Sequence, residues 1–131
     1  GRPLLGICVG MQLLFEGSEE GPVGDGVGAI AGTVRRLPGT VKVPHIGWND
    51  VKVQPGGRLL AGLPEGSRFY FVHSYAPEAS GPAVAAVCDY GAPFAAAVER
   101  DNLFGSQFHP EKSGASGLAL LSNFVDQARR A

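Results

Sequence analysis

The sequence predicts an α/β domain built around a central sheet. Short apolar runs rich in valine, alanine and phenylalanine recur along the chain and are separated by turn residues, which is typical of β-strands. Residues 116–130 instead have apolar positions at helical spacing. The 131 residues are 44% hydrophobic and 18% charged, a composition that suits one folded domain spanning residues 1–131.

The first expected elements are a strand and a helix. Residues 4–7 form an apolar run that predicts a buried strand, whereas Met11, Leu14 and Phe15 recur at helical spacing. Cys8 therefore falls at the corner between the two elements.

The middle of the chain is predicted to form short strands. Residues 29–37 have β-type character, and valines alternate at 41 and 43 and again at 51 and 53. One helical turn is expected near residues 58–63. Four more β-type runs then follow, at residues 68–72, 83–90, 93–99 and 102–109, with a hairpin turn at 100–102. In the C-terminal helix we expect the buried face to carry Leu118, Leu121, Val125 and Ala128.

Charge and composition exclude several classes of function. The formal net charge is −1 and no long basic cluster exists, so we expect neither nucleic-acid nor membrane-surface binding. No apolar run approaches the roughly 18 residues of a membrane span. The two cysteines could pair but form no dense disulfide framework, so a reducing, cytoplasmic setting is expected. We expect no metal and no other cofactor, because metal-ligand spacing is absent and the G-x-G-x-x-A stretch at 26–31 lacks a preceding strand.

Cys8 has the sequence context of a nucleophile. Residues 6–10, Gly-Ile-Cys-Val-Gly, fit the pattern G-x-C-x-G, the thiol form of the nucleophile elbow, in which glycines relieve clashes at a strained turn. The N-terminus of the following helix would favour the thiolate over the thiol. The alternative is a buried core thiol, which is our interpretation of Cys88.

A base and an orienting group are available in residues 108–111, Phe-His-Pro-Glu. His109 precedes a proline, which favours extended backbone, and in extended backbone residues two apart project to the same side. Glu111 is therefore expected to hold the His109 ring, as a nucleophile's base requires. The alternative for this stretch is a solvated surface loop.

The stretches LLGICVGMQLLFEGSEEG and QFHPEKSG resemble class I glutamine amidotransferases. The resemblance implies a Cys8–His109–Glu111 triad that hydrolyses L-glutamine to glutamate and ammonia through a γ-glutamyl thioester. It also implies a three-layer fold with a central mixed, mostly parallel sheet. That family is normally about 200 residues long, so we expect its N-terminal strands and helices to be missing here and the chain alone to be inactive, because one oxyanion-hole donor would come from that part.

Substrate contacts are also implied by this resemblance. The backbone N–H of Val9 would be one oxyanion-hole donor. Gln12, four residues after Cys8 on the same helical face, would bind the substrate glutamine. The backbone of Ser74 and Tyr75 would contact the amino-acid end of the substrate.

A partner is implied by the segment PHIGWN at 44–49, which together with GSEEG resembles the glutaminase subunit of imidazole glycerol phosphate synthase. The expected partner is a (β/α)₈-barrel cyclase subunit that receives the ammonia, and Trp48, Asn49 and Lys112 would face it. Three alternatives remain: an amidotransferase of another pathway, a thiol peptidase or chaperone with a related elbow, and an inactive binding module.

Overall fold

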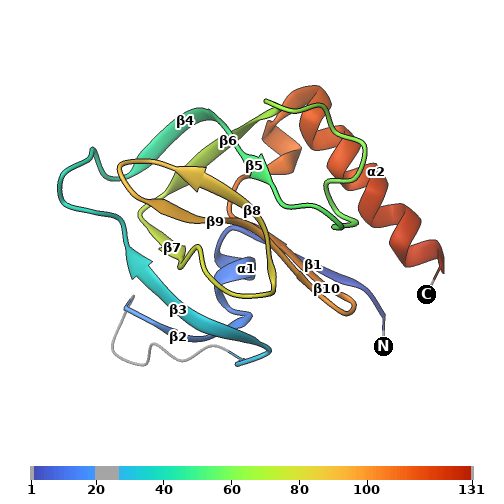
Figure 1. Cartoon of the computed structure of the whole chain (residues 1–131), viewed down its shortest axis with the longest axis horizontal. Helices are drawn as coiled ribbons and strands as arrows, with labels where there is room; N and C mark the ends of the chain where they lie inside the picture. The colour runs from blue at the N-terminus through green and yellow to red at the C-terminus, as the bar shows by residue number, and fades with distance from the viewer. Residues whose placement is uncertain (1, 20–26, 131) are drawn as a thin grey trace.

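The computed structural model describes residues 2–19 and 27–130 (Figure 1). The GSEEG and G-x-G-x-x-A stretches lie partly outside these residues. In chain order the elements are β1 (Leu4–Ile7), α1 (Val9–Gln12), β2 (Phe15–Ser18), β3 (Ile30–Arg36), β4 (His45–Asp50), β5 (Lys52–Val53), β6 (Arg68–His73), β7 (Tyr75–Pro77), β8 (Val84–Asp89), β9 (Pro93–Arg100), β10 (Leu103–Ser106), the 3₁₀ turn η1 (Pro110–Lys112) and α2 (Gly114–Arg130).

The central sheet has five strands in the order β1-β10-β9-β8-β5, and it is mixed, as predicted. Two smaller sheets, β2-β3-β7 and β4-β6, accompany it. The parallel pairs among the described residues are β1–β10 and β2–β3, and the other pairs are antiparallel. A predominance of parallel strands is therefore not found in this part of the fold, because β8, β9 and β10 are joined by short turns, which can connect only antiparallel neighbours.

The central sheet separates two apolar clusters. One includes side chains of β6, β10 and α2, and the other includes side chains of α1, β2 and β3. Along β9, Phe94 and Ala96 belong to the first cluster, whereas Ala95 and Val98 belong to the second. Figure 1 shows the same layers, with β4, β6 and α2 on one side of β9 and β10, and β2, β3 and β7 on the other.

Helix α1 is a single turn, shorter than the helical spacing predicts. It ends at Gln12, and Phe15 already begins strand β2, where it pairs with Ile30. Met11, Leu14 and Phe15 are nevertheless all buried in one cluster. The spacing of these residues therefore reflects a shared core, which the chain reaches by a turn and a strand instead of a continued helix.

The C-terminal helix forms as predicted, but of the expected buried face only Leu121 packs against the first cluster, and the other three residues are exposed. Leu118 is 70% exposed and Val125 45% exposed, whereas Leu120 is fully buried. The helix is oriented by Gly117, because a Cβ at that position would lie 1.9 Å from the carbonyl oxygen of Pro110. Only a glycine permits this approach, so position 117 faces the domain and Leu120 follows it. None of the helices in the described residues is long and apolar enough to cross a membrane.

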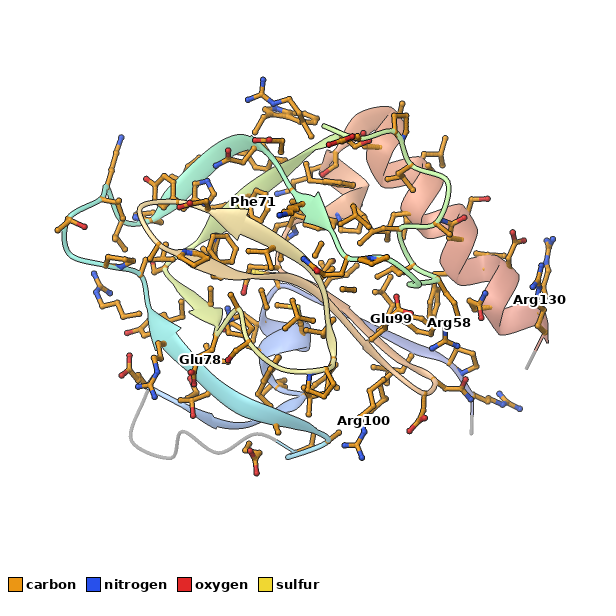
Figure 2. The ribbon with its side chains drawn as sticks, in the orientation of Figure 1. Arg58, Phe71, Glu78, Glu99, Arg100 and Arg130 are labelled. Carbon is orange, nitrogen blue, oxygen red and sulfur yellow. The ribbon has the colours of Figure 1, made fainter. Side chains whose placement is uncertain are left out.

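Two loop segments also differ from expectation. Residues 38–44 contain no strand, and the next strand begins at His45. Residues 58–62 form hydrogen-bonded turns instead of a helical turn. The carboxylate of Glu99 accepts the backbone N–H groups of Arg58 and Leu59, at 2.9 and 3.1 Å, and ties these turns to the end of β9. Figure 2 shows the Arg58 and Glu99 side chains next to each other.

Candidate active site

Cys8 lies at a strained corner between β1 and α1, as the sequence predicts. Its backbone has φ 56° and ψ −110°, a left-handed conformation that is rare for a residue with a side chain and typical of functional sites. The helix folds back onto the strand so closely that a Cβ at Gly6 would lie 2.6 Å from the carbonyl carbon and oxygen of Gly10. Gly6 is thus required for the corner.

The second glycine of the pattern has a different status. A Cβ at Gly10 would meet no atom within 4 Å, so this glycine relieves no clash. The residue that assists Gly6 is Gly105, its partner on the neighbouring strand β10, where a Cβ would lie 2.4 Å from Cγ of Met11. The corner therefore rests on two glycines that are adjacent in space and distant in sequence.

Parallel pairing of β1 with β10 places the ends of both strands at one edge of the sheet. Ile7 pairs with Ser106, and the N–H of Cys8 donates to the Ser106 carbonyl at 2.7 Å. Residues 107–109 follow directly on β10. The stretch that carries His109 thus continues from the strand next to the one that carries Cys8, although the two residues are far apart in sequence.

Strand β6 contacts both residues. The N–H of His109 donates to the carbonyl oxygen of Tyr70 at 2.9 Å, and the sulfur of Cys8 lies 3.9 Å from the carbonyl oxygen of Val72. Tyr70 and Val72 are two residues apart on the same strand. Cys8 and His109 therefore both lie against β6, at the end of the β1–β10 pair.

Glu111 holds the His109 ring. Nδ1 of His109 lies 2.9 Å from Oε2 of Glu111. Burial raises the pKa of Glu111, but the hydrogen bonds from His109 and its own backbone and the charges of His109 and Lys112 outweigh this, so the pKa lies below its ordinary value. The carboxylate stays ionised, and His109 donates from Nδ1, which leaves Nε2 as the nitrogen able to accept a proton.

Gln12 is buried and its amide is fixed by two acceptors. Nε2 lies 3.0 Å from the carbonyl oxygen of Tyr75 and 3.0 Å from Oε1 of Gln107. Because both amide hydrogens are used, Gln12 can offer a ligand its carbonyl oxygen. The carbonyl of Ser74 accepts from the N–H of Leu37 at 2.9 Å. Of the two predicted backbone residues, Tyr75 thus contacts Gln12, and the carbonyls of both Ser74 and Tyr75 are already engaged by the chain.

Gln107 belongs to this site and was missed by the sequence analysis. It is fully buried, its oxygen accepts from Gln12, and its Nε2 lies 3.6 Å from the sulfur of Cys8. A signal was present, since an amide at a position that continues an apolar strand must find buried partners. Nothing in the local pattern identifies those partners.

The residues expected to face a partner are separated by the structure. Trp48 is 48% exposed, and Ile46 is exposed on the same face of β4. Lys112 is exposed at the end of η1. Asn49 points inward, and its Nδ2 lies 2.9 Å from Nε2 of His45. Alternation along a strand explains the difference, because successive side chains project to opposite faces.

The second cysteine is a core residue, as predicted. Cys88 is 1% exposed, and burial together with the charges of Asp50 and Asp89 raises its pKa to about 12. A thiol with such a pKa is not a nucleophile at neutral pH. Among residues 2–19 and 27–130 no group of three or more His, Cys, Asp or Glu side chains could hold a metal ion. The nucleophile candidate is therefore Cys8.

Comparisons with known proteins identify the family of this chain. Residues 1–128 match the family model of class-I glutamine amidotransferases. The chain is 52% identical to imidazole glycerol phosphate synthase subunit HisH of Dechloromonas aromatica, covering 95% of this chain and 62% of the relative. It is 55% identical to the subunit of the same name from Deinococcus radiodurans, covering 95% and 59%. The chain thus spans about three-fifths of the length of these relatives.

A solved structure supports the fold independently. A putative GMP synthase subunit from Thermoplasma acidophilum superimposes with a TM-score of 0.70 at 21% identity, covering 98% of this chain and 58% of that one. A match over nearly the whole chain to the family model, together with this fold, leads to one conclusion. The chain belongs to the class-I glutamine amidotransferases.

Proposed function

We propose that this chain supplies the glutaminase site of an imidazole glycerol phosphate synthase subunit, which hydrolyses L-glutamine to glutamate and ammonia. The observation that best supports this proposal is the strained corner at Cys8, which lies at the same sheet edge as the stretch that contains the His109–Glu111 pair. The identity of about 50% to HisH subunits supports the pathway.

In the proposed reaction, the Cys8 thiol passes its proton to Nε2 of His109, and the resulting thiolate attacks the side-chain carbonyl carbon of glutamine. The resulting tetrahedral intermediate collapses as its C–N bond breaks, and His109 gives the departing nitrogen a proton, so that ammonia leaves. A γ-glutamyl thioester remains on Cys8. Water then loses a proton to His109 and attacks the thioester, which releases glutamate and the thiolate.

Negative charge develops on the former carbonyl oxygen of the substrate. We assign the N–H of Val9 as one donor to this oxygen, because Val9 is the first residue of α1 and the first N–H groups of a helix have no acceptor within it. We assign Gln12 to binding the unreactive part of glutamine through its carbonyl oxygen, and Ser74 and Tyr75 to the same pocket.

The proposed partner is a (β/α)₈-barrel cyclase subunit in the cytoplasm. Ammonia becomes ammonium in bulk water and is then no longer a nucleophile, so direct transfer to a second site is chemically sensible. We place the docking surface at Trp48 and Lys112, which are exposed, with Ile46 beside Trp48. The phosphates of the cyclase substrate would bind to the partner, which agrees with the net charge of −1 here.

Labelling with a glutamine-like diazo ketone tests the nucleophile. The full-length protein, in complex with its cyclase subunit, should form one thioether adduct with loss of N₂, as measured by intact mass. The adduct should persist in Cys88→Ser and vanish in Cys8→Ser. An adduct lost only in the Cys88 variant would overturn the assignment, and no adduct at all would indicate a binding module.

Product analysis tests the pathway. With glutamine and the phosphorylated ribulosyl substrate, the same complex should release imidazole glycerol phosphate. Glutamine hydrolysis without this product would place the chain in another amidotransferase pathway.

A further inference from the structure

Two buried histidines, His45 on β4 and His73 on β6, lie near the proposed glutamine pocket. The proposed reaction does not use them. His45 is 2% exposed and His73 is 6% exposed, and they face each other across the β4–β6 pair. The ring of His45 stacks between Tyr90 and Phe71, at centroid distances of 3.8 and 5.0 Å. Figure 2 labels Phe71 in the layer that contains β6.

Both histidines are neutral at neutral pH. Burial lowers the pKa of His73 to about 4, and burial also lowers the pKa of His45. A neutral imidazole has one nitrogen that donates and one that accepts. Each ring can therefore donate one hydrogen bond and accept one, and the partner of one nitrogen determines the role of the other.

The contact between His73 and Tyr75 determines the direction of these hydrogen bonds. Nδ1 of His73 lies 2.9 Å from the carbonyl oxygen of Tyr75, which can only accept, so Nδ1 carries the proton. Nε2 of His73 must then accept, and Nδ1 of His45 donates to it at 3.0 Å. Nε2 of His45 is left as an acceptor, and it lies 2.9 Å from Nδ2 of Asn49, which donates. Every polar atom in this chain of contacts has the complementary role.

The Tyr75 carbonyl is where this chain meets the pocket. It accepts from Nδ1 of His73 and, at 3.0 Å, from Nε2 of Gln12. Gln12 in turn donates to Gln107, whose amide lies against the sulfur of Cys8. A shift of the Tyr75 carbonyl would therefore turn the Gln12 amide and its carbonyl oxygen.

We propose that His45 and His73 are positioning residues, which hold the Tyr75 carbonyl so that Gln12 presents its oxygen to glutamine. The inference deepens the proposed function, on which it rests for the identity of the ligand. It assigns the histidines to substrate binding, because their ring nitrogens contact the Tyr75 carbonyl, each other and Asn49. Loss of the hydrogen bond should therefore raise KM and leave kcat nearly unchanged.

Two substitutions at His73 separate positioning from packing. His73→Leu fills the volume without a donor, whereas His73→Asn loses volume and keeps an amide N–H close to the position of Nδ1. In the full-length protein with its cyclase subunit, His73→Leu should raise KM for glutamine about tenfold, the effect of one lost hydrogen bond. The Asn variant should restore KM to within about threefold, and kcat should stay within about twofold in both.

Alkylation of Cys8 by iodoacetamide reports on the corner without using the glutamine pocket. Its rate should be unchanged in both variants. An unchanged KM in His73→Leu, or an Asn variant no better than Leu, would overturn the proposal. A joint fall of kcat and alkylation rate would indicate a packing role instead.

A second measurement does not depend on glutamine hydrolysis. The ¹⁵N shifts of the histidine rings should show the Nδ1–H tautomer at both His45 and His73 in the unmodified protein. An Nε2–H tautomer at either residue would end the proposal whether or not the chain is a glutaminase. The expected tautomers without any glutamine turnover would count against the proposed function alone.

Discussion

The side chain of Gln107 joins Cys8 to Gln12, with its Nε2 3.6 Å from the Cys8 sulfur and its Oε1 3.0 Å from the Gln12 amide nitrogen. Cys8 is 99 positions away in sequence and Gln12 is 95 positions away. Gln107 is fully buried, and its contact with Gln12 is buried as well. The proposed nucleophile and the proposed substrate-binding residue are thereby held in one network.

Gln107→Glu should slow the reaction of Cys8. The substitution keeps an acceptor for Gln12 but replaces the N–H that faces the sulfur with a carboxylate oxygen, and a nearby negative charge disfavours a thiolate. We expect the iodoacetamide rate at pH 7 to fall about tenfold and its pH midpoint to rise by about one unit. Gln54→Glu, the same change away from this edge, serves as the control. An unmoved midpoint in Gln107→Glu would contradict the assigned contact.

Gly6→Ala should destabilise the fold, whereas Gly10→Ala should not. A Cβ at Gly6 would collide with the backbone of residue 10, and overpacking of this kind costs about 2 kcal/mol. A Cβ at Gly10 would meet nothing within 4 Å, and alanine is the better helix former. Urea unfolding of the two variants measures the difference. Equal free energies of unfolding would show that the close approach at Gly6 is not required.

Glu111→Gln should reduce turnover more than binding. The neutral amide would no longer stabilise a charged His109 ring, to which Glu111 is bonded at 2.9 Å. We expect kcat for glutamine to fall about a hundredfold with KM within about twofold, as for lost general acid–base assistance. The exposed Glu65→Gln is the control. A kcat within about threefold of the unmodified value would remove Glu111 from the proposed triad.

The free energy of unfolding should decrease as the pH is lowered from 6.5 to about 4, because of His73. Its folded pKa of about 4 lies below the ordinary 6.5, so in this window the unfolded chain binds more protons and the free energy of unfolding decreases as pH falls. The contribution is at most about 1.4 kcal/mol per pH unit. Denaturant unfolding of the full-length protein should show a weaker pH dependence in His73→Asn, which has no imidazole at this position. Parallel curves for the two proteins would contradict the lowered pKa.

Trp48→Ala should weaken binding to the cyclase subunit. Trp48 is 48% exposed on the outer face of β4, and a buried tryptophan is a common centre of binding energy at interfaces. We expect Kd to rise at least about tenfold by calorimetry. Leu118→Ala removes an exposed apolar side chain from a different element, helix α2, and should leave Kd unchanged. Equal effects of the two substitutions would place the docking surface elsewhere.

Local patterns in the sequence determined much of this protein. Short apolar runs between turn residues are enough to predict β6, β8 and β9, and the turn at Asp101 adopts the positive φ that a tight hairpin requires. The sequence pattern predicts a corner at Cys8, because the close approach that requires Gly6 is to the backbone of Gly10, only four residues away. The Glu111–His109 contact is likewise short-range, although Glu111 lies in the 3₁₀ turn η1 and not in the extended backbone that the sequence predicts.

Tertiary structure decided the features that depend on distant segments. Gln107 gains its role from partners 95 and 99 positions away, and the two histidines meet each other across 28 positions, which no local pattern specifies. Helix α2 offers more than one apolar stripe, and the backbone of Pro110 selects the one that begins at Gly117. The physical reason is the same in each case. Burial stabilises the face or amide that meets a complementary surface, and that surface exists only after the chain has folded.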